Sequence, residues 1–171
     1  VRALQTAHIT FGDYLPTTTT TTTATEQLQR RDVKWIAHEG IREELGTLMC
    51  NKRQPFSETK SQFPLVDYTH LPQVEEDVLW NDHAIQTSDE NGVPQRESME
   101  DMSHRAYDFL TEFVYRRPER EIAVVGHSAW LLAMTGAVLD LEDGDDNGSL
   151  EVKSMFGQAE LRSLELVFME R

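Results

Sequence analysis

Gly126-His127-Ser128 stands between an apolar run, Ile122–Val125, and an apolar, helix-like segment that begins at Ser128. A strand that runs into a helix through a glycine places polar side chains at the carboxyl edge of a sheet, where α/β proteins build sites. Ser128 is a poor candidate nucleophile, because Trp130 occupies a position where a nucleophile elbow needs a small residue. No histidine base comes after Ser128, since His127 is the last of six histidines. This leaves His127 as the residue that could do chemistry.

The helix that begins at Ser128 would strengthen the attraction of an anion to the site of His127. Unpaired backbone N–H groups at the N-terminus of a helix attract negative charge. An imidazolium at the same place can donate to a phosphoryl oxygen, and arginine side chains from elsewhere can clamp that group bidentately. The pattern therefore favours an anion site, suited to a phosphoryl group, around His127 and Ser128.

The elements that must position these residues alternate between helix and strand. Apolar residues at three- and four-residue spacing predict a helix over Arg2–Phe11 that ends at Gly12. An apolar stripe predicts the clearest helix over Glu97–Arg117, with Ser98 and Asp101 in the arrangement of a capping box. The other predicted elements are helices over Ala24–Arg31 and Ser128–Leu139, and strands over Val33–Ala37, Ile122–Val125 and the terminal "ELRSLELVF". This order predicts an α/β fold with a layered sheet.

Two stretches interrupt this alternation. Residues 16–24 contain seven consecutive threonines, and such a run predicts a loop or insertion because threonine is a poor helix former and an unbroken polar run cannot alternate faces. Residues 38–96 are long, proline-punctuated and mixed in periodicity, which is typical of an excursion from the scaffold that covers a site as a lid.

Composition and charge narrow the class of protein. The chain has 171 residues, enough for one domain with a core, and its formal net charge of -14 argues against a nucleic-acid surface. No apolar run reaches membrane-spanning length, and the first residues lack the zones of a signal peptide. The single cysteine, Cys50, fits a reducing compartment, most simply the cytoplasm, and we expect a buried thiol there. The histidines have no metal-ligand spacing, so we expect neither metal nor cofactor.

Four short motifs and one long block resemble a known family. The motifs are "VRALQTA", "IREELG", "AVVGHSAWLL" and "QAELRSLEL", and they occur in the order typical of the histidine phosphatase superfamily. The block "REELGTLMCNKRQPFSETKSQFPLVDYTHLPQVEEDVLW" resembles the plant and fungal phosphoglycerate-mutase-like proteins. The resemblance implies one domain over residues 1–171, with a three-layer α/β sandwich and a mostly parallel central sheet. It also implies that the first strand is missing, because the family's Arg-His-Gly motif is not in this chain.

The resemblance gives each candidate residue a role around a phosphoryl group. The family's nucleophile is the histidine of the absent motif, which would carry the phosphoryl group covalently. Arg2 matches the family's phosphate-clamping arginine, and His127 matches its second histidine, which would donate in its charged form. Ser128 would begin the helix that helps hold the anion. Arg53 is a candidate for contacting the substrate, or equally a structural partner of Glu75, Glu76 or Asp77.

The acid that protonates the leaving oxygen is Glu43 or Glu44. In much of the superfamily the acid stands four residues before the glycine of this motif, where this chain has Arg42. The plant-like pattern, Arg-Glu-x-Leu-Gly, favours Glu43. Only one of two adjacent carboxylates can face a cleft and have the raised pKa that an acid needs, and the other is then a solvated charge.

The function that these residues predict is that of a phosphatase acting on a small phosphomonoester through a phosphohistidine intermediate. That activity belongs to a longer protein, because this chain lacks the nucleophile and should be inactive alone. Two alternatives stay open: a phosphoglycerate mutase, and a non-catalytic phosphate-binding or scaffold protein. The partner expected in each case is a small phosphorylated molecule, and neither nucleic acid nor a membrane.

Overall fold

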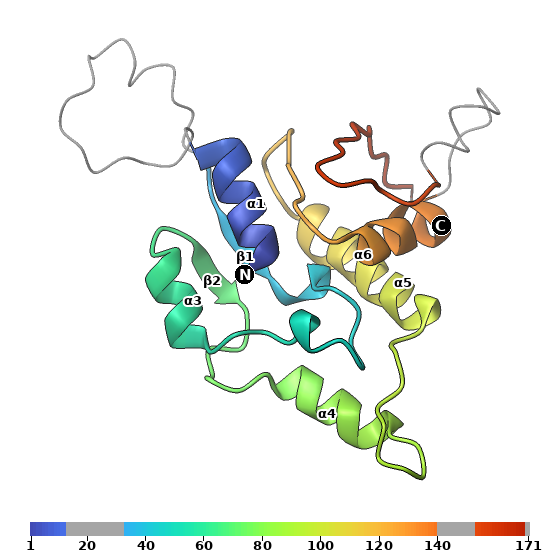
Figure 1. The fold of residues 1–171 in the computed structure, drawn as a ribbon. Coiled ribbons are helices and arrows are strands. Elements are labelled where there is room, and N and C mark those ends of the chain that lie inside the picture. Colours follow the sequence, from blue (N-terminus) through green and yellow to red (C-terminus); the bar gives the residue numbers. More distant parts are fainter. Residues whose placement is uncertain (13–32, 140–152, 170–171) are drawn as a thin grey trace.

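A computed structural model describes residues 1–12, 33–139 and 153–169. Helices predominate, and a small sheet lies beside the first of them, α1 (Arg2–Phe11) (Figure 1). The predicted helix over Arg2–Phe11 is therefore confirmed with the same bounds. The threonine-rich stretch 16–24 and the predicted helix Ala24–Arg31 lie outside the described residues. None of the described helices is long and apolar enough to pass through a bilayer.

The sheet in the described residues consists of two parallel strands, β1 (Ile36–His38) and β2 (Asp67–His70). Ile36 is in register with Asp67 and His38 with His70. The strand predicted over Val33–Ala37 exists, but it begins and ends later. β2 belongs to the stretch 38–96, so part of the predicted excursion joins the sheet. Its role as a lid stays a prediction.

Four short elements connect these strands or come after them. They are the 3-10 turns η2 (Glu39–Ile41) and η3 (Met49–Asn51), and the helices α3 (Phe56–Gln62) and α4 (Val78–Thr87). A small buried cluster of Ala37, Phe56 and Tyr68 joins β1, α3 and β2, and Leu4 of α1 packs against it. This cluster fixes α1 beside the sheet.

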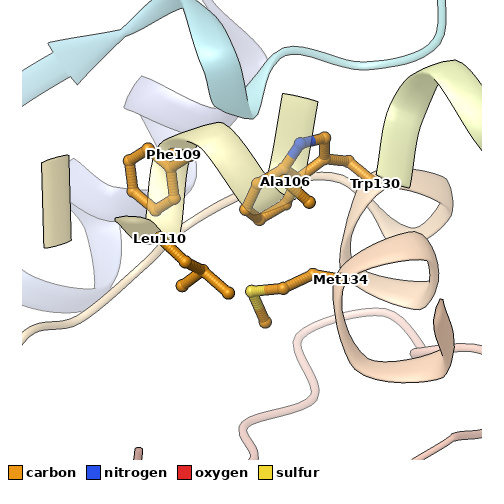
Figure 2. Packing of buried hydrophobic residues seen from close by; sticks show 5 residues of the cluster. All are labelled: Ala106, Phe109, Leu110, Trp130 and Met134. Carbon is orange, nitrogen blue, oxygen red and sulfur yellow. The ribbon is translucent and has the colours of Figure 1, made fainter. Parts of the chain in front are cut away.

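The main core lies between two long helical segments. The first is α5 (Met99–Asp108), which continues into a π-helical turn, η4 (Phe109–Val114). The second is α6 (Ser128–Ala133), which continues into η5 (Met134–Val138). Figure 2 shows Trp130 and Met134 of the second segment directed at the cluster residues of the first, which are Ala106, Phe109 and Leu110. Trp130 and Ala106 are fully buried, so this contact fixes the angle at which the second segment begins.

Both helices predicted from the apolar stripes are confirmed in these segments. Ser98 caps α5, since its Oγ accepts the N–H of Asp101 at 3.1 Å and donates to the Asp101 carboxylate at 2.7 Å. The Asp101 carboxylate therefore contacts the hydroxyl of Ser98. In the usual capping box the acid would instead reach the backbone N–H of the cap residue, so the arrangement here is a variant.

Two predicted strands are wrong. Residues Ile122–Val125 and the terminal "ELRSLELVF" form no strand, and β1 and β2 pair only with each other within the described ranges. An apolar or alternating pattern forms a strand only beside another strand that completes its hydrogen bonds. Leu166 and Phe168, two of the alternating apolar residues that would form the buried face of the terminal strand, are 37% and 40% exposed, so that face is not buried. The fold class is still α/β, because the helices accompany a parallel sheet. The described residues contain two strands and no three-layer sandwich.

Candidate active site

His127 and Glu43 face each other across the site. His127 is the residue before α6 and has an extended backbone (φ -113°, ψ 151°), which turns its ring away from the helix axis. Its Nδ1 lies 3.3 Å from Oε2 of Glu43. The two side chains are 19% and 15% exposed, so both are largely buried and keep some access to solvent. A residue from the first third of the chain and one from its last third thus form one polar pair.

The surroundings of His127 favour the neutral form of its imidazole. Burial, above all, and the positive charge of Arg2 lower its pKa to about 4. The expectation of a charged histidine concerns the site with phosphate bound, and it stays a prediction. A neutral ring still carries one N–H, and a bound phosphate dianion would favour the protonated form.

The structure separates the two adjacent glutamates. Glu43 directs its carboxylate at His127, and its Oε1 also accepts the backbone N–H of Glu44 at 3.1 Å. Glu44 instead forms an ion pair with Arg96 at 3.3 Å. The two carboxylates therefore have different neighbours, and only that of Glu43 reaches the histidine.

A buried ion pair holds the segment that carries these glutamates. Arg42 donates to both carboxylate oxygens of Asp77, at 2.9 and 2.7 Å, and to Glu39 at 2.5 Å. The Arg42 and Asp77 side chains are 9% and 2% exposed. Burial opposes the charge of both, yet their mutual hydrogen bonds raise the pKa of Arg42 and lower that of Asp77. Asp77 also caps α4 by accepting the N–H of Trp80 at 3.2 Å. The fork geometry of arginine suits this bidentate contact with the Asp77 carboxylate.

A second ion pair fixes the same segment to α5. Arg105 donates to both oxygens of the Glu97 carboxylate, at 2.7 and 2.8 Å, and to the carbonyl oxygen of Gly40 at 3.0 Å. Glu97 in turn accepts the backbone N–H of Leu45 at 3.0 Å. Gly46 comes next with φ +130°, and a Cβ there would lie 2.7 Å from the backbone of Arg96. The segment is therefore held at both ends, and only glycine fits where it turns away.

Arg2 approaches the site from α1. It is exposed, and its Nη2 donates to Oδ1 of Asn51 at 2.9 Å. Its charge contributes to the lowered pKa of His127. Glu43 and His127 thus form a pair, and Arg2 of α1 is joined through the Asn51 side chain to the segment that carries Glu43.

Arg53 and Ser128 have other neighbours. The guanidinium of Arg53 donates to the carbonyl oxygens of Val74 and Glu76, at 2.9 and 2.7 Å, and its backbone N–H donates to Asp77 at 2.7 Å. Arg53 therefore acts as a structural partner of this stretch, as one of the two alternatives proposed, and it does so mainly through backbone carbonyl oxygens. Ser128 is the exposed first residue of α6, and the residue that caps this helix is His127, whose side chain forms no capping hydrogen bond.

Two further expectations concern cysteine and metal. Cys50 is exposed, so the prediction of a buried thiol is wrong. It stands in the turn η3, which has no buried residue. Within the described ranges no group of three or more histidine, cysteine, aspartate or glutamate side chains is arranged to hold a metal ion.

Sequence comparison identifies the class of protein. The model of the histidine phosphatase superfamily (branch 1) matches residues 39–152. The chain therefore belongs to this superfamily, as the motifs predict. The match includes the buried ion pairs, Glu43 and His127, while Arg2 lies before it.

Curated relatives come from Arabidopsis thaliana. Phosphoglycerate mutase-like protein 1 is 32% identical over 132 residues, which are 77% of this chain and 42% of the relative. A phosphoglycerate mutase-like protein is 29% identical over 133 residues, 78% of this chain and 44% of the relative. The chain thus spans less than half the length of these relatives. No solved structure matches it significantly.

Proposed function

We propose that this chain supplies the phosphate-binding and proton-donating half of a phosphatase for small phosphomonoesters. The observation that carries the proposal is the pair of Glu43 and His127, with Arg2 joined through Asn51 to the segment of Glu43. A cation, a hydrogen-bond donor and a carboxylic acid are the groups that stabilise and protonate a departing phosphoryl ester. Membership of the histidine phosphatase superfamily supports this chemistry.

Each group has one task in the proposed reaction. A histidine outside this chain attacks phosphorus, forms the N–P bond and displaces the alcohol oxygen. Arg2 and His127 bind the equatorial oxygens, whose charge shifts in the transition state, and Glu43 gives its proton to the leaving oxygen. Water then cleaves the N–P bond and releases phosphate. No metal or cofactor has a task in this scheme.

The alternatives differ in the step after phosphoryl transfer. A mutase would return the phosphoryl group to a second hydroxyl of the substrate, and a scaffold would bind phosphate without transfer. We favour hydrolysis because the long central block resembles the phosphatase-like subgroup. Arg53 is a weaker candidate for substrate contact, because backbone carbonyls already occupy its guanidinium.

The proposal is tested by joining this chain to a segment with an Arg-His-Gly strand and measuring hydrolysis of a generic phosphomonoester. Arg2→Ala should abolish most turnover, since it removes the cation nearest the second histidine. Arg116→Ala is the matched control, because this exposed arginine pairs with Glu112 on η4. Equal activity of the two variants, or transfer to a second hydroxyl in place of water, would contradict the proposal.

The acid is tested with substrates that differ in their leaving group. Glu43→Gln should slow esters with poor leaving groups by about 100-fold and leave those with good ones much less affected. Glu44→Gln is the matched control and should behave like the parent. If Glu44→Gln shows the selective loss instead, the acid is the other carboxylate.

A further inference from the structure

The side chain of Asn51 contacts two parts of the candidate site at once. Its Oδ1 accepts Nη2 of Arg2 at 2.9 Å, and its Nδ2 donates to the carbonyl oxygen of Glu44 at 3.1 Å. One amide group therefore connects α1 with the segment that carries Glu43. Nothing in the sequence motifs points to this residue, because the contact joins segments far apart in the chain.

Asn51 is itself held in place. Its backbone N–H donates to the carbonyl oxygen of Leu48 at 2.8 Å within η3. Its carbonyl oxygen accepts from Nη2 of Arg42 at 3.5 Å, and Arg42 is fixed by the buried pair with Asp77. Asn51 is half-buried, and its backbone contacts the buried pair of Arg42 and Asp77 through Arg42.

The contact leaves part of Arg2 available. Within the part of the chain that the structure describes, only Nη2 of Arg2 donates to protein, to Asn51 and at 3.5 Å to the carbonyl oxygen of Cys50. Nε and Nη1 remain for an anion. An exposed arginine without such a contact samples many rotamers, and ordering them on binding costs affinity. An amide that accepts from one edge of the guanidinium fixes the direction in which the remaining donors point.

We propose that Asn51 is a positioning residue that holds Arg2 beside His127 and aims its free donors at the bound phosphate. The role of this contact in phosphate binding rests on the proposed function. Asn51 itself does not touch the phosphate; it acts through Arg2.

The first experiment measures binding of inorganic phosphate to this chain by NMR chemical-shift titration. Asn51→Leu should weaken binding about tenfold, because it keeps the size of the side chain and removes both hydrogen bonds. In an Arg2→Ala background the same substitution should have no further effect, since the two residues act as a unit. Asn81→Leu is the matched control, because its Oδ1 accepts only from Lys52 on the other side of Asp77. Losses that add up in the double variant would overturn the inference.

The second experiment tests the position of Arg2 in the absence of phosphate. The charge of Arg2 lowers the pKa of His127, so a freed Arg2 should let that pKa rise. Titration of the His127 ring should show this rise in Asn51→Leu and a larger rise in Arg2→Ala. Asn51→Ala serves if the leucine variant does not fold. An unchanged His127 pKa in a folded Asn51 variant would overturn the inference.

The two experiments separate two kinds of failure. If the parent chain binds no phosphate, the proposed function fails, and the His127 titration still decides whether Asn51 holds Arg2. If the parent chain binds phosphate and the Asn51 variants bind it equally well, the proposed function stands and the role of Asn51 does not.

Discussion

His38 and His127 offer a comparison within one molecule, because each ends an apolar stretch and each has a pKa of about 4. His38 is the last residue of β1, and its Nδ1 accepts the backbone N–H of Gly40 at 3.0 Å. Its ring stacks on His70 at 5.1 Å and packs edge-on against Phe109 at 5.0 Å. One nitrogen is thus used by backbone, and the rings around it are packing partners.

The neighbours of His127 are of another kind. Its Nδ1 faces the carboxylate of Glu43, and the cation of Arg2 lies close enough to lower its pKa. A lowered pKa therefore does not by itself mark a catalytic histidine, since burial contributes most to both values. The polar groups that face the ring distinguish the two positions.

The largest expected difference between the two histidines appears when each ring is removed in turn. In a protein that supplies the nucleophile, His127→Ala should reduce phosphomonoester hydrolysis about a thousandfold, because it removes a donor to the transition-state oxygens. His38→Asn should leave turnover within about threefold, since the asparagine oxygen can still accept the N–H of Gly40. Steady-state kinetics of both variants decides it. Near-normal turnover of His127→Ala would remove the distinction between the two histidines.

A second test asks what holds Glu43 beside His127. Asp77→Ala should lower the free energy of unfolding by about 3 kcal/mol or more, because it leaves the buried Arg42 without its bidentate partner. Asp108→Ala, an exposed carboxylate beside His38, should change it by less than about 0.5 kcal/mol. Urea unfolding measures both. Similar small losses would mean that the Arg42 pair contributes little to holding the segment.

The sequence predicts the residues around His127 better than the elements that support them. Periodicity correctly predicts the helices of α1, α5 and α6, because each has an apolar face that packs within the chain. The strand predictions at Ile122–Val125 and at the terminus fail because strand formation depends on a neighbouring strand, which no local pattern reports.

The contacts that hold the site also cannot be predicted from local sequence patterns. Family resemblance proposes Arg2, Glu43 and His127, yet Arg42, Asp77 and Asn51 matter through contacts that join distant segments. A buried arginine in "IREELG" looks like any solvated charge. The lowered pKa of His127 has the same origin, since its burial and the effect of Arg2 become visible only in three dimensions.

A third test uses the lowered pKa values themselves. Between pH 6.5 and 4 an unfolded histidine takes up a proton that the folded His127 does not, so the free energy of unfolding should fall as the pH falls. The loss from His127 should reach about 3 kcal/mol near pH 4, and that from His38 should be smaller because its ring is more open. His127→Gln and His38→Asn should each flatten this part of the pH profile. An unchanged profile in His127→Gln would mean that the pKa of the ring is the same in the folded protein as in the unfolded chain.

The smallest expected effect separates the causes of the two shifts. Burial is the first cause at both histidines, but the second is His70 for His38 and Arg2 for His127. His70→Asn should therefore raise the pKa of His38, which should stay below 6.5 because burial persists. The pKa of His127 should not change, since no part of its shift comes from His70. NMR titration of both rings in one sample measures the pair. A parallel rise at His127 would mean that the two positions share one electrostatic environment, and the comparison would then describe a single site.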